Sequence, residues 1–190
     1  SHKSASFTDQ YGPNRLAESI VTGFETNDKG TTKQDISGIG GGLIDGAIGQ
    51  YSNMLSHDFN NPDSCLVNST NNDIDQTDAY FQVDFAINGV VNNPEKFFFA
   101  FHEGSDTSIS SQHYAFFMSS DEATLYDDAN MVYEYKTTAG VGQGVEHLYD
   151  ISGLGITNVK FVGVRFYHRG YKGHVQHLIE LGMFGGEFIF

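Results

Sequence analysis

The side chains best suited to chemistry in this sequence lie close together near its C-terminal end. Two apolar-rich runs, 161–166 and 175–184, flank a short segment dense in aromatic, basic and imidazole groups. A sugar site needs an aromatic face for the apolar C–H surface of the ring and a few fixed polar groups for its hydroxyls. The segment offers both, and we predict that it binds a ligand through Tyr167, His168, Arg169, Tyr171 and His174.

The two flanking runs predict two strands, and the glycine-bearing break between them predicts a hairpin that would present this segment at its tip. Glu180 lies inside the second run, where a carboxylate needs a partner. A bound cation is one such partner. Arg165 on the neighbouring strand is another.

Composition limits the classes of function. The chain has 190 residues, which favours one domain with a substantial core, and a formal net charge of −14. That charge argues against nucleic acid and anionic membranes as partners, because phosphates require a basic surface. Cys65 is the only cysteine, so no intrachain disulfide forms. No apolar run is long enough for a membrane helix, so we expect no membrane insertion.

Short apolar runs separated by glycine and polar segments favour β-structure. Residues 80–87 alternate well, and the aromatic run at 96–101 is typical of a strand buried on both faces. The sequence predicts a single all-β domain over 1–190, a two-sheet antiparallel jelly-roll β-sandwich, with an irregular leader at 1–14. Strands are expected at 19–26, 80–87, 96–101, 114–118, 131–135, 146–151, 161–166 and 175–184.

Two other segments are expected to lack strands. The polar stretch 56–78 is rich in Asn and Asp and predicts a long surface loop, which in a compact domain is usually functional. Residues 121–127 predict a short helical turn capped by Ser120.

Three segments in order, the last of them a closing pair of strands, carry a family resemblance. The sequence resembles the galactose-binding-like jelly roll, specifically discoidin-like (coagulation factor C-type) domains and family 32 carbohydrate-binding modules. The likeness spans roughly residues 15 to 187. Its motifs are Leu-Ile-Asp-Gly at 43–46 with Gln50 and Tyr51, Ala-Tyr-Phe-Gln-Val-Asp-Phe at 79–85, Phe-Val-Gly-Val-Arg-Phe at 161–166 and Ile-Glu-Leu-Gly-Met-Phe-Gly at 179–185.

The resemblance implies a structural Ca²⁺ ion between the early Asp-Gly loop and the late strand glutamate. Calcium takes six to eight oxygen ligands, many of them backbone carbonyls, which suits a glycine-rich loop. Carried over by position, the ligands are the Asp45 and Glu180 carboxylates, the Gln50 side chain, and the carbonyls of Gly42, Ala47 and Ile179. The alternative is that Asp45 caps a turn and Glu180 pairs with Arg165.

The resemblance also implies that loops at one end of the fold bind glycan, with Tyr171 at the position of the aromatic residue that stacks on the sugar. It adds four residues from other loops to the ligand site: Tyr51, His57, His102 and Glu103. The alternative is that Tyr167 packs on the core and that the histidines decorate a solvated turn. A transition-metal site of His168, His174 and His177 is a further alternative, although a spacing of three puts His174 and His177 on opposite faces of a strand.

Three functions follow from these observations. We predict a non-catalytic carbohydrate-binding module, because the sequence contains no nucleophile elbow, zinc-protease motif or phosphate loop. It would belong to an extracellular or cell-surface, multimodular, bacterial protein that binds polysaccharide. An adhesion or protein-interaction domain of the same fold is the first alternative. A polysaccharide-degrading enzyme is the second, with Glu103 and either Asp106 or Glu146 as its carboxylates.

Overall fold

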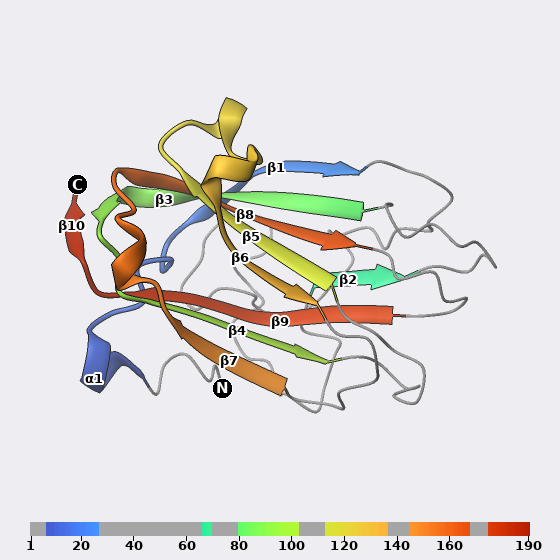
Figure 1. Ribbon diagram of the computed structural model, residues 1–190, viewed down its shortest axis with the longest axis horizontal. Coiled ribbons are helices and arrows are strands. Elements are labelled where there is room, and N and C mark those ends of the chain that lie inside the picture. The colour runs from blue at the N-terminus through green and yellow to red at the C-terminus, as the bar shows by residue number, and fades with distance from the viewer. Residues whose placement is uncertain (1–6, 27–65, 70–79, 103–112, 137–144, 168–174) are drawn as a thin grey trace.

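Strands make up nearly all of the regular structure. The computed structural model of the chain describes residues 7–26, 66–69, 80–102, 113–136, 145–167 and 175–190 (Figure 1). Within these ranges, six strands form one antiparallel sheet and four form another, which confirms the predicted all-β sandwich.

The six-stranded sheet, sheet A, has the order β1-β3-β8-β5-β6, and β10 pairs with the second half of β3. Its strands are β1 (Ile20–Thr26), β3 (Tyr80–Asn92), β5 (His113–Ser119), β6 (Met131–Lys136), β8 (Val159–Tyr167) and β10 (Glu187–Ile189). The four-stranded sheet, sheet B, has the order β2-β9-β4-β7. Its strands are β2 (Leu66–Ser69), β4 (Lys96–His102), β7 (Val145–Asp150) and β9 (Val175–Phe184).

The predicted hairpin between β8 and β9 is wrong. β8 lies in sheet A between β3 and β5, whereas β9 lies in sheet B between β2 and β4. The connection therefore crosses from one sheet to the other. Among the described strands only β5 and β6 are both consecutive and paired. A short polar segment can join strands of one sheet or of two stacked sheets, so local sequence does not distinguish the two.

Two short strands lie where the sequence predicted none. β2 falls inside the stretch 56–78, which was expected to be a loop, and β10 follows the last predicted strand. The helical turn after Ser120 is present as 3₁₀ turns at Glu122–Thr124 and Asp128–Asn130. Its cap is Asp121 and not Ser120, because an Asp121 carboxylate oxygen accepts a bond from the Ala123 amide at 3.0 Å.

The core lies between the two sheets and follows the alternation of the strands. Val83 and Phe85 of β3 and Phe97 and Phe99 of β4 point into it. Phe98 points the other way and is buried beneath α1 (Thr8–Tyr11), where the Phe7 ring lies 5.1 Å from its own. Burial on both faces, predicted for the 96–101 strand, is thus confirmed for residues 97–99.

The edge strands β6 and β7 close one side of the core with aromatic rings. The centroids of Tyr133 and Tyr149 are 3.8 Å apart, and those of Tyr135 and His147 are 4.6 Å apart. Burial raises the pKa of Tyr149, and its hydrogen bond with Tyr133 adds to the effect. Burial also lowers the pKa of His147 below its usual value of 6.5, because an apolar setting disfavours the imidazolium form.

Stability should therefore fall in mild acid. The folded-state pKa of His147 lies below 6.5, so as the pH falls the unfolded chain protonates this imidazole before the folded chain does. The contribution of His147 to the free energy of unfolding is therefore fully present above pH 6.5 and is lost as the pH falls toward the lower folded-state pKa. We expect His147→Phe to reduce the slope of melting temperature against pH in that window. Thermal scans of both proteins across the window test this, and parallel slopes would contradict it.

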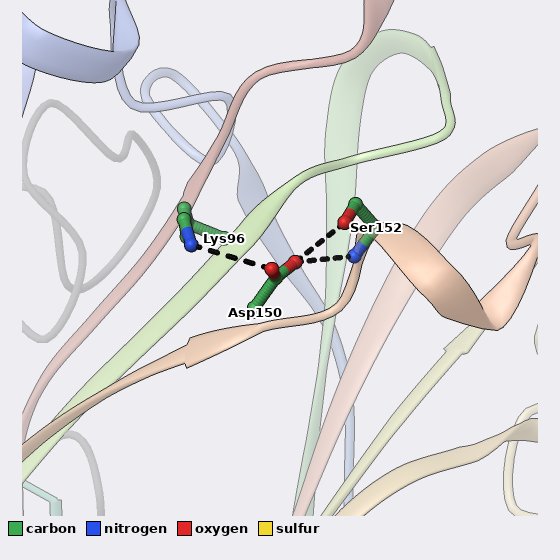
Figure 2. Close-up of polar contacts among 3 residues, drawn as sticks. All are labelled: Lys96, Asp150 and Ser152. Carbon is green, nitrogen blue, oxygen red and sulfur yellow. Dashed lines mark hydrogen bonds and ion pairs between the residues drawn. The ribbon is translucent and has the colours of Figure 1, made fainter.

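A polar cluster secures the end of β7 (Figure 2). One Asp150 carboxylate oxygen accepts bonds from the Ser152 hydroxyl at 2.5 Å and the Ser152 amide at 3.0 Å. The other lies 3.7 Å from Lys96 Nζ on β4. These bonds, and then the Lys96 charge, lower the pKa of Asp150 because they favour its ionised form. The cluster joins β4, β7 and the 3₁₀ turn Ser152–Leu154.

Candidate functional site

Strand ends from both sheets meet at one end of the sandwich, which we call the Tyr167 end (right in Figure 1). The cross-strand pairs Tyr80–Tyr167 and His113–Lys136 lie there in sheet A. The pair His102–His177 lies there in sheet B. The two segments predicted to bind ligand, the one that follows His102 and the one between Tyr167 and Val175, both start at this end.

Tyr167 is held by a ring from the neighbouring strand. It is the last residue of β8, and its ring stacks on that of His113, the first residue of β5, with centroids 4.1 Å apart and planes 18° apart. His113 is only 8% exposed, and Tyr167 is half-buried. Tyr167 packs against the outer-face cluster of sheet A that includes Ala115 and Phe117, not against the core between the sheets.

Glu134 fixes the orientation of His113. His113 Nε2 lies 3.0 Å from a carboxylate oxygen of Glu134, which stands on the next strand, β6. Because a carboxylate only accepts hydrogen bonds, the imidazole must carry its proton on Nε2 and donate it. Glu134, His113 and Tyr167 thus form a row across three adjacent strands, β6, β5 and β8, on the outer face of sheet A. The row positions an aromatic ring where the predicted ligand segment begins.

The two residues of the predicted calcium site that fall on described strands lie at an irregularity in β9. Glu180 is opposite Ala100, but Leu178 is opposite Phe101, so Ile179 has no counterpart on β4. Within the described part of the chain, the pairing of β2 with β9 ends at Leu178. A residue left out of the ladder by a bulge has a backbone carbonyl available for another partner. This suits the role predicted for Ile179.

The other predicted site residues lie outside the described part of the chain. For the ligand site these are Tyr51, His57, Glu103, His168, Arg169, Tyr171 and His174. For the calcium site they are Gly42, Asp45, Ala47 and Gln50. Their roles stay predictions. Within the described ranges there is no group of three or more His, Cys, Asp or Glu side chains that could hold a metal ion.

Arg165 does not stand on a strand next to that of Glu180, as the alternative required, because β8 lies in sheet A and β9 in sheet B. Its guanidinium donates to the Gln82 side-chain oxygen at 2.8 and 3.0 Å on the outer face of sheet A, while Glu180 belongs to sheet B. The guanidinium also lies 4.9 Å from the centroid of the Tyr126 ring. The correction follows from the crossing connection, which places β8 and β9 in different sheets.

A groove that no local sequence pattern predicted lies beside Arg165. It has a volume of about 590 Å³ and lies between β1, β3 and the segment around residue 122. The Tyr126 hydroxyl donates to Asp84 in its wall, and Glu122 stands nearby. A side chain at Gly23 would displace the Asp84 carboxylate, because a Cβ there would lie 2.7 Å from one of its oxygens. The alternation of β3 predicted that Gln82 and Asp84 face outward, but Tyr126 and Glu122 come from a distant part of the chain.

The sequence matches no protein-family model and no curated protein. Solved structures do match. An F-lectin (fucolectin) from striped bass (Morone saxatilis) serum aligns with 93% of this chain and 48% of its own, with 10% identity and a TM-score of 0.51. The K1 cleaved adhesin domain of Lys-gingipain from Porphyromonas gingivalis W83 aligns with 91% of this chain and 96% of its own, with 17% identity and a TM-score of 0.50.

The chain has the galactose-binding-like jelly-roll fold. A Clostridium perfringens ZmpB chain with CBM32-1, CBM32-2 and M60 catalytic domains aligns with 98% of this chain, with 14% identity and a TM-score of 0.47. This chain covers 16% of the length of the ZmpB chain and about half of the length of the fucolectin chain. At these identities the likeness concerns the fold, and what each of those proteins binds is a property of that protein. No described helix of the jelly roll is long and apolar enough to cross a membrane.

Proposed function

We propose that this jelly roll is a non-catalytic carbohydrate-binding module that binds glycan at its Tyr167 end. The observation that carries the proposal is the row Glu134–His113–Tyr167, which holds an aromatic ring at the start of the predicted ligand segment. An aromatic face kept in one orientation suits a sugar ring, because little side-chain freedom is lost on binding. Arg169, Tyr171 and His174 would then supply further contacts from that segment.

The biological setting is part of the same proposal. A serum lectin and an adhesin domain of a bacterial protein share the fold. This supports a role outside the cell or at its surface, within a larger protein of several modules. In such a protein a weak glycan site gains strength from other modules, because linked sites raise the effective local concentration. The net charge of −14 agrees with a neutral glycan rather than a polyanionic one.

The proposal is tested by removing the Tyr167 ring. We expect Tyr167→Ala to weaken retention in an affinity gel that contains a bound polysaccharide by about tenfold or more, the loss of about 1.4 kcal/mol or more of binding free energy. Tyr11→Ala is the matched control, because Tyr11 packs on Phe184 far from the Tyr167 end, and its retention should not change. Equal retention by all three proteins would contradict the site. Release of reducing ends from the polysaccharide by the wild-type chain would contradict the non-catalytic assignment.

A structural calcium ion beneath this site is a second part of the proposal. The predicted donors are two carboxylates, one amide and three carbonyls, a set of hard oxygen ligands that suits Ca²⁺. The irregular pairing of β9 at Ile179 supports the carbonyl ligand assigned to that residue. When bound, the ion would tie the early Asp-Gly loop to β9. Glu180 would provide charge compensation for it.

Removal of calcium should destabilise the fold. A ligand present at a hundred times its dissociation constant stabilises a protein by about 2.7 kcal/mol. For a chain of this size that corresponds to a melting temperature about 5–10 °C lower in EDTA. Added Ca²⁺ should restore the value, and Glu180→Gln should reduce the difference between the two conditions. Identical melting curves with EDTA and with Ca²⁺ would rule out the ion.

A further inference from the structure

The groove beside Arg165, which we call the Asp84 groove, lies on the outer face of sheet A. The inward side chains of β3 form part of the core, and Gln82 and Asp84 alternate with them, so both face outward into the groove. The 3₁₀ turn Glu122–Thr124 contributes Glu122 to the opposite wall. The volume of about 590 Å³ is within the range of small-ligand sites.

The outer face of sheet A connects the Asp84 groove with the Tyr167 end. Cross-strand pairing places Arg165 of β8 opposite Gln82, which lines the groove. Tyr167 follows Arg165 by two residues on the same strand, so it shares that face and lies about 7 Å further along it. That separation is one that neighbouring rings of a glycan chain can span. The Tyr167 ring and the groove therefore belong to one continuous surface.

Arg165 is held in a fixed position on this surface. Its guanidinium donates to the Gln82 side-chain oxygen at 2.8 and 3.0 Å. It also lies 4.9 Å from the centroid of the Tyr126 ring and 5.6 Å from that of Phe117. Arg165 is half-buried. Because a guanidinium has five N–H donors in one rigid plane, an arginine held in this way can donate to a ligand as well as to Gln82.

Carboxylate oxygens from two separate segments face the space above Gly23. A Cβ at Gly23 would lie 2.7 Å from Oδ2 of Asp84 and 3.5 Å from Oε1 of Glu122. The Tyr126 hydroxyl donates to the other Asp84 oxygen, Oδ1, which fixes the orientation of that carboxylate. Ionised carboxylates only accept hydrogen bonds, whereas Arg165 only donates them. The surface thus offers both partners that sugar hydroxyls require.

We propose that the glycan bound at the Tyr167 end is a neutral, unbranched oligosaccharide that continues across Arg165 into the Asp84 groove. The proposal rests on the glycan-binding function proposed above and extends it from one sugar ring to several linked rings. Tyr167 would stack on one ring, and Arg165 would donate to the hydroxyls of the next. Asp84 and Glu122 would accept hydroxyls of a ring in the groove. An acidic sugar fits less well, because these carboxylates would repel it.

The test is a series of glycans of increasing length, followed by backbone amide chemical shifts of the labelled chain. The probes are β-1,4-linked galactose and β-1,4-linked N-acetylglucosamine, each from the monosaccharide to the hexasaccharide. For at least one series we expect the dissociation constant to fall by about tenfold or more between these lengths. The monosaccharide should shift amides near Tyr167 and His113. The longer members should also shift amides of residues 22–23 and 122–126.

Two variants separate the groove from the Tyr167 ring. Glu122→Gln should weaken binding of the hexasaccharide by about tenfold, since a hydrogen bond to a charged group is lost, and leave the monosaccharide unaffected. Ala123→Phe should act in the same way, because Ala123 is exposed and lines the groove, so the ring would fill it without entering the core. Asp128→Asn is the matched control. It removes the same charge from an exposed residue of the next 3₁₀ turn, outside the groove, and should change neither affinity.

Each outcome decides one of the two proposals. Equal affinity for all lengths, with shifts confined to the Tyr167 end, would overturn the extended site and leave the proposed function standing. A gain with length that neither Glu122→Gln nor Ala123→Phe reduces would overturn the path through the groove. Shifts confined to the groove would contradict the Tyr167 site and the continuous path with it. No shift with any member of either series would overturn both proposals.

Discussion

Replacement of Phe99 with alanine is expected to lower the free energy of unfolding by about 3–5 kcal/mol. The Phe99 side chain is fully buried at the centre of the core. The centroid of its ring lies 4.7 Å from the centroid of Phe116 and 5.8 Å from that of Tyr149. Phe99 therefore joins the centre of sheet A to the aromatic edge of sheet B. Alanine would remove these contacts and leave a cavity that the paired strands cannot close. Urea denaturation of both proteins measures the difference.

Phe190→Ala is the matched control for Phe99→Ala. It removes the same atoms from a ring that is 91% exposed, so the expected change is within about 0.5 kcal/mol. Similar losses for the two variants would contradict the placement of Phe99 in the core. A loss at Phe99 of less than about 1 kcal/mol would contradict it as well.

Asn14→Ala should have the second largest effect, about 2–4 kcal/mol, although Asn14 precedes the first strand. Its Oδ1 accepts the amides of Leu16 and Met183, and each buried amide that loses its acceptor costs about 1–3 kcal/mol. The substitution would thus release the N-terminal segment from β9. Denaturation in urea gives the loss, and hydrogen exchange at the Met183 amide shows whether the segment has detached.

Asn88→Ala is the control for Asn14→Ala. Asn88 is exposed and bonds only to the exposed Glu18 among the contacts described here, so its loss should cost about 0.5 kcal/mol or less. If Asn14→Ala proves as mild as Asn88→Ala, or if the Met183 amide exchanges at the wild-type rate, residues 14–16 do not anchor β9.

Local patterns predicted most of the strands correctly. Alternation in 80–87 placed Val83 and Phe85 inward, and both lie in the core. The apolar run 175–184 coincides with β9. These patterns succeed because alternating exposure along a strand is set by the backbone itself, whatever the strand pairs with. β2 was missed because its four residues, Leu-Val-Asn-Ser, are too few and too polar to give such a pattern.

Strand partners could not be predicted in the same way. β8 and β9 are consecutive apolar runs, yet β8 pairs with β3 and β9 pairs with β4, and both partners lie far away in the sequence. The same limit applies to the site. The sequence predicted a ligand role for Tyr167 but none for His113 or Glu134, because only the order of the strands in sheet A brings these three together.

The most direct test of glycan binding at the Tyr167 end is a glycan array probed in Ca²⁺ with the labelled wild-type chain and with Tyr167→Ala. Binding of the wild type to a restricted set of glycans, and its loss in the variant, is the result we predict. Two results would contradict the assignment: no glycan retained above background, which would favour a protein or cell-surface partner, or full retention by Tyr167→Ala, which would place the site elsewhere.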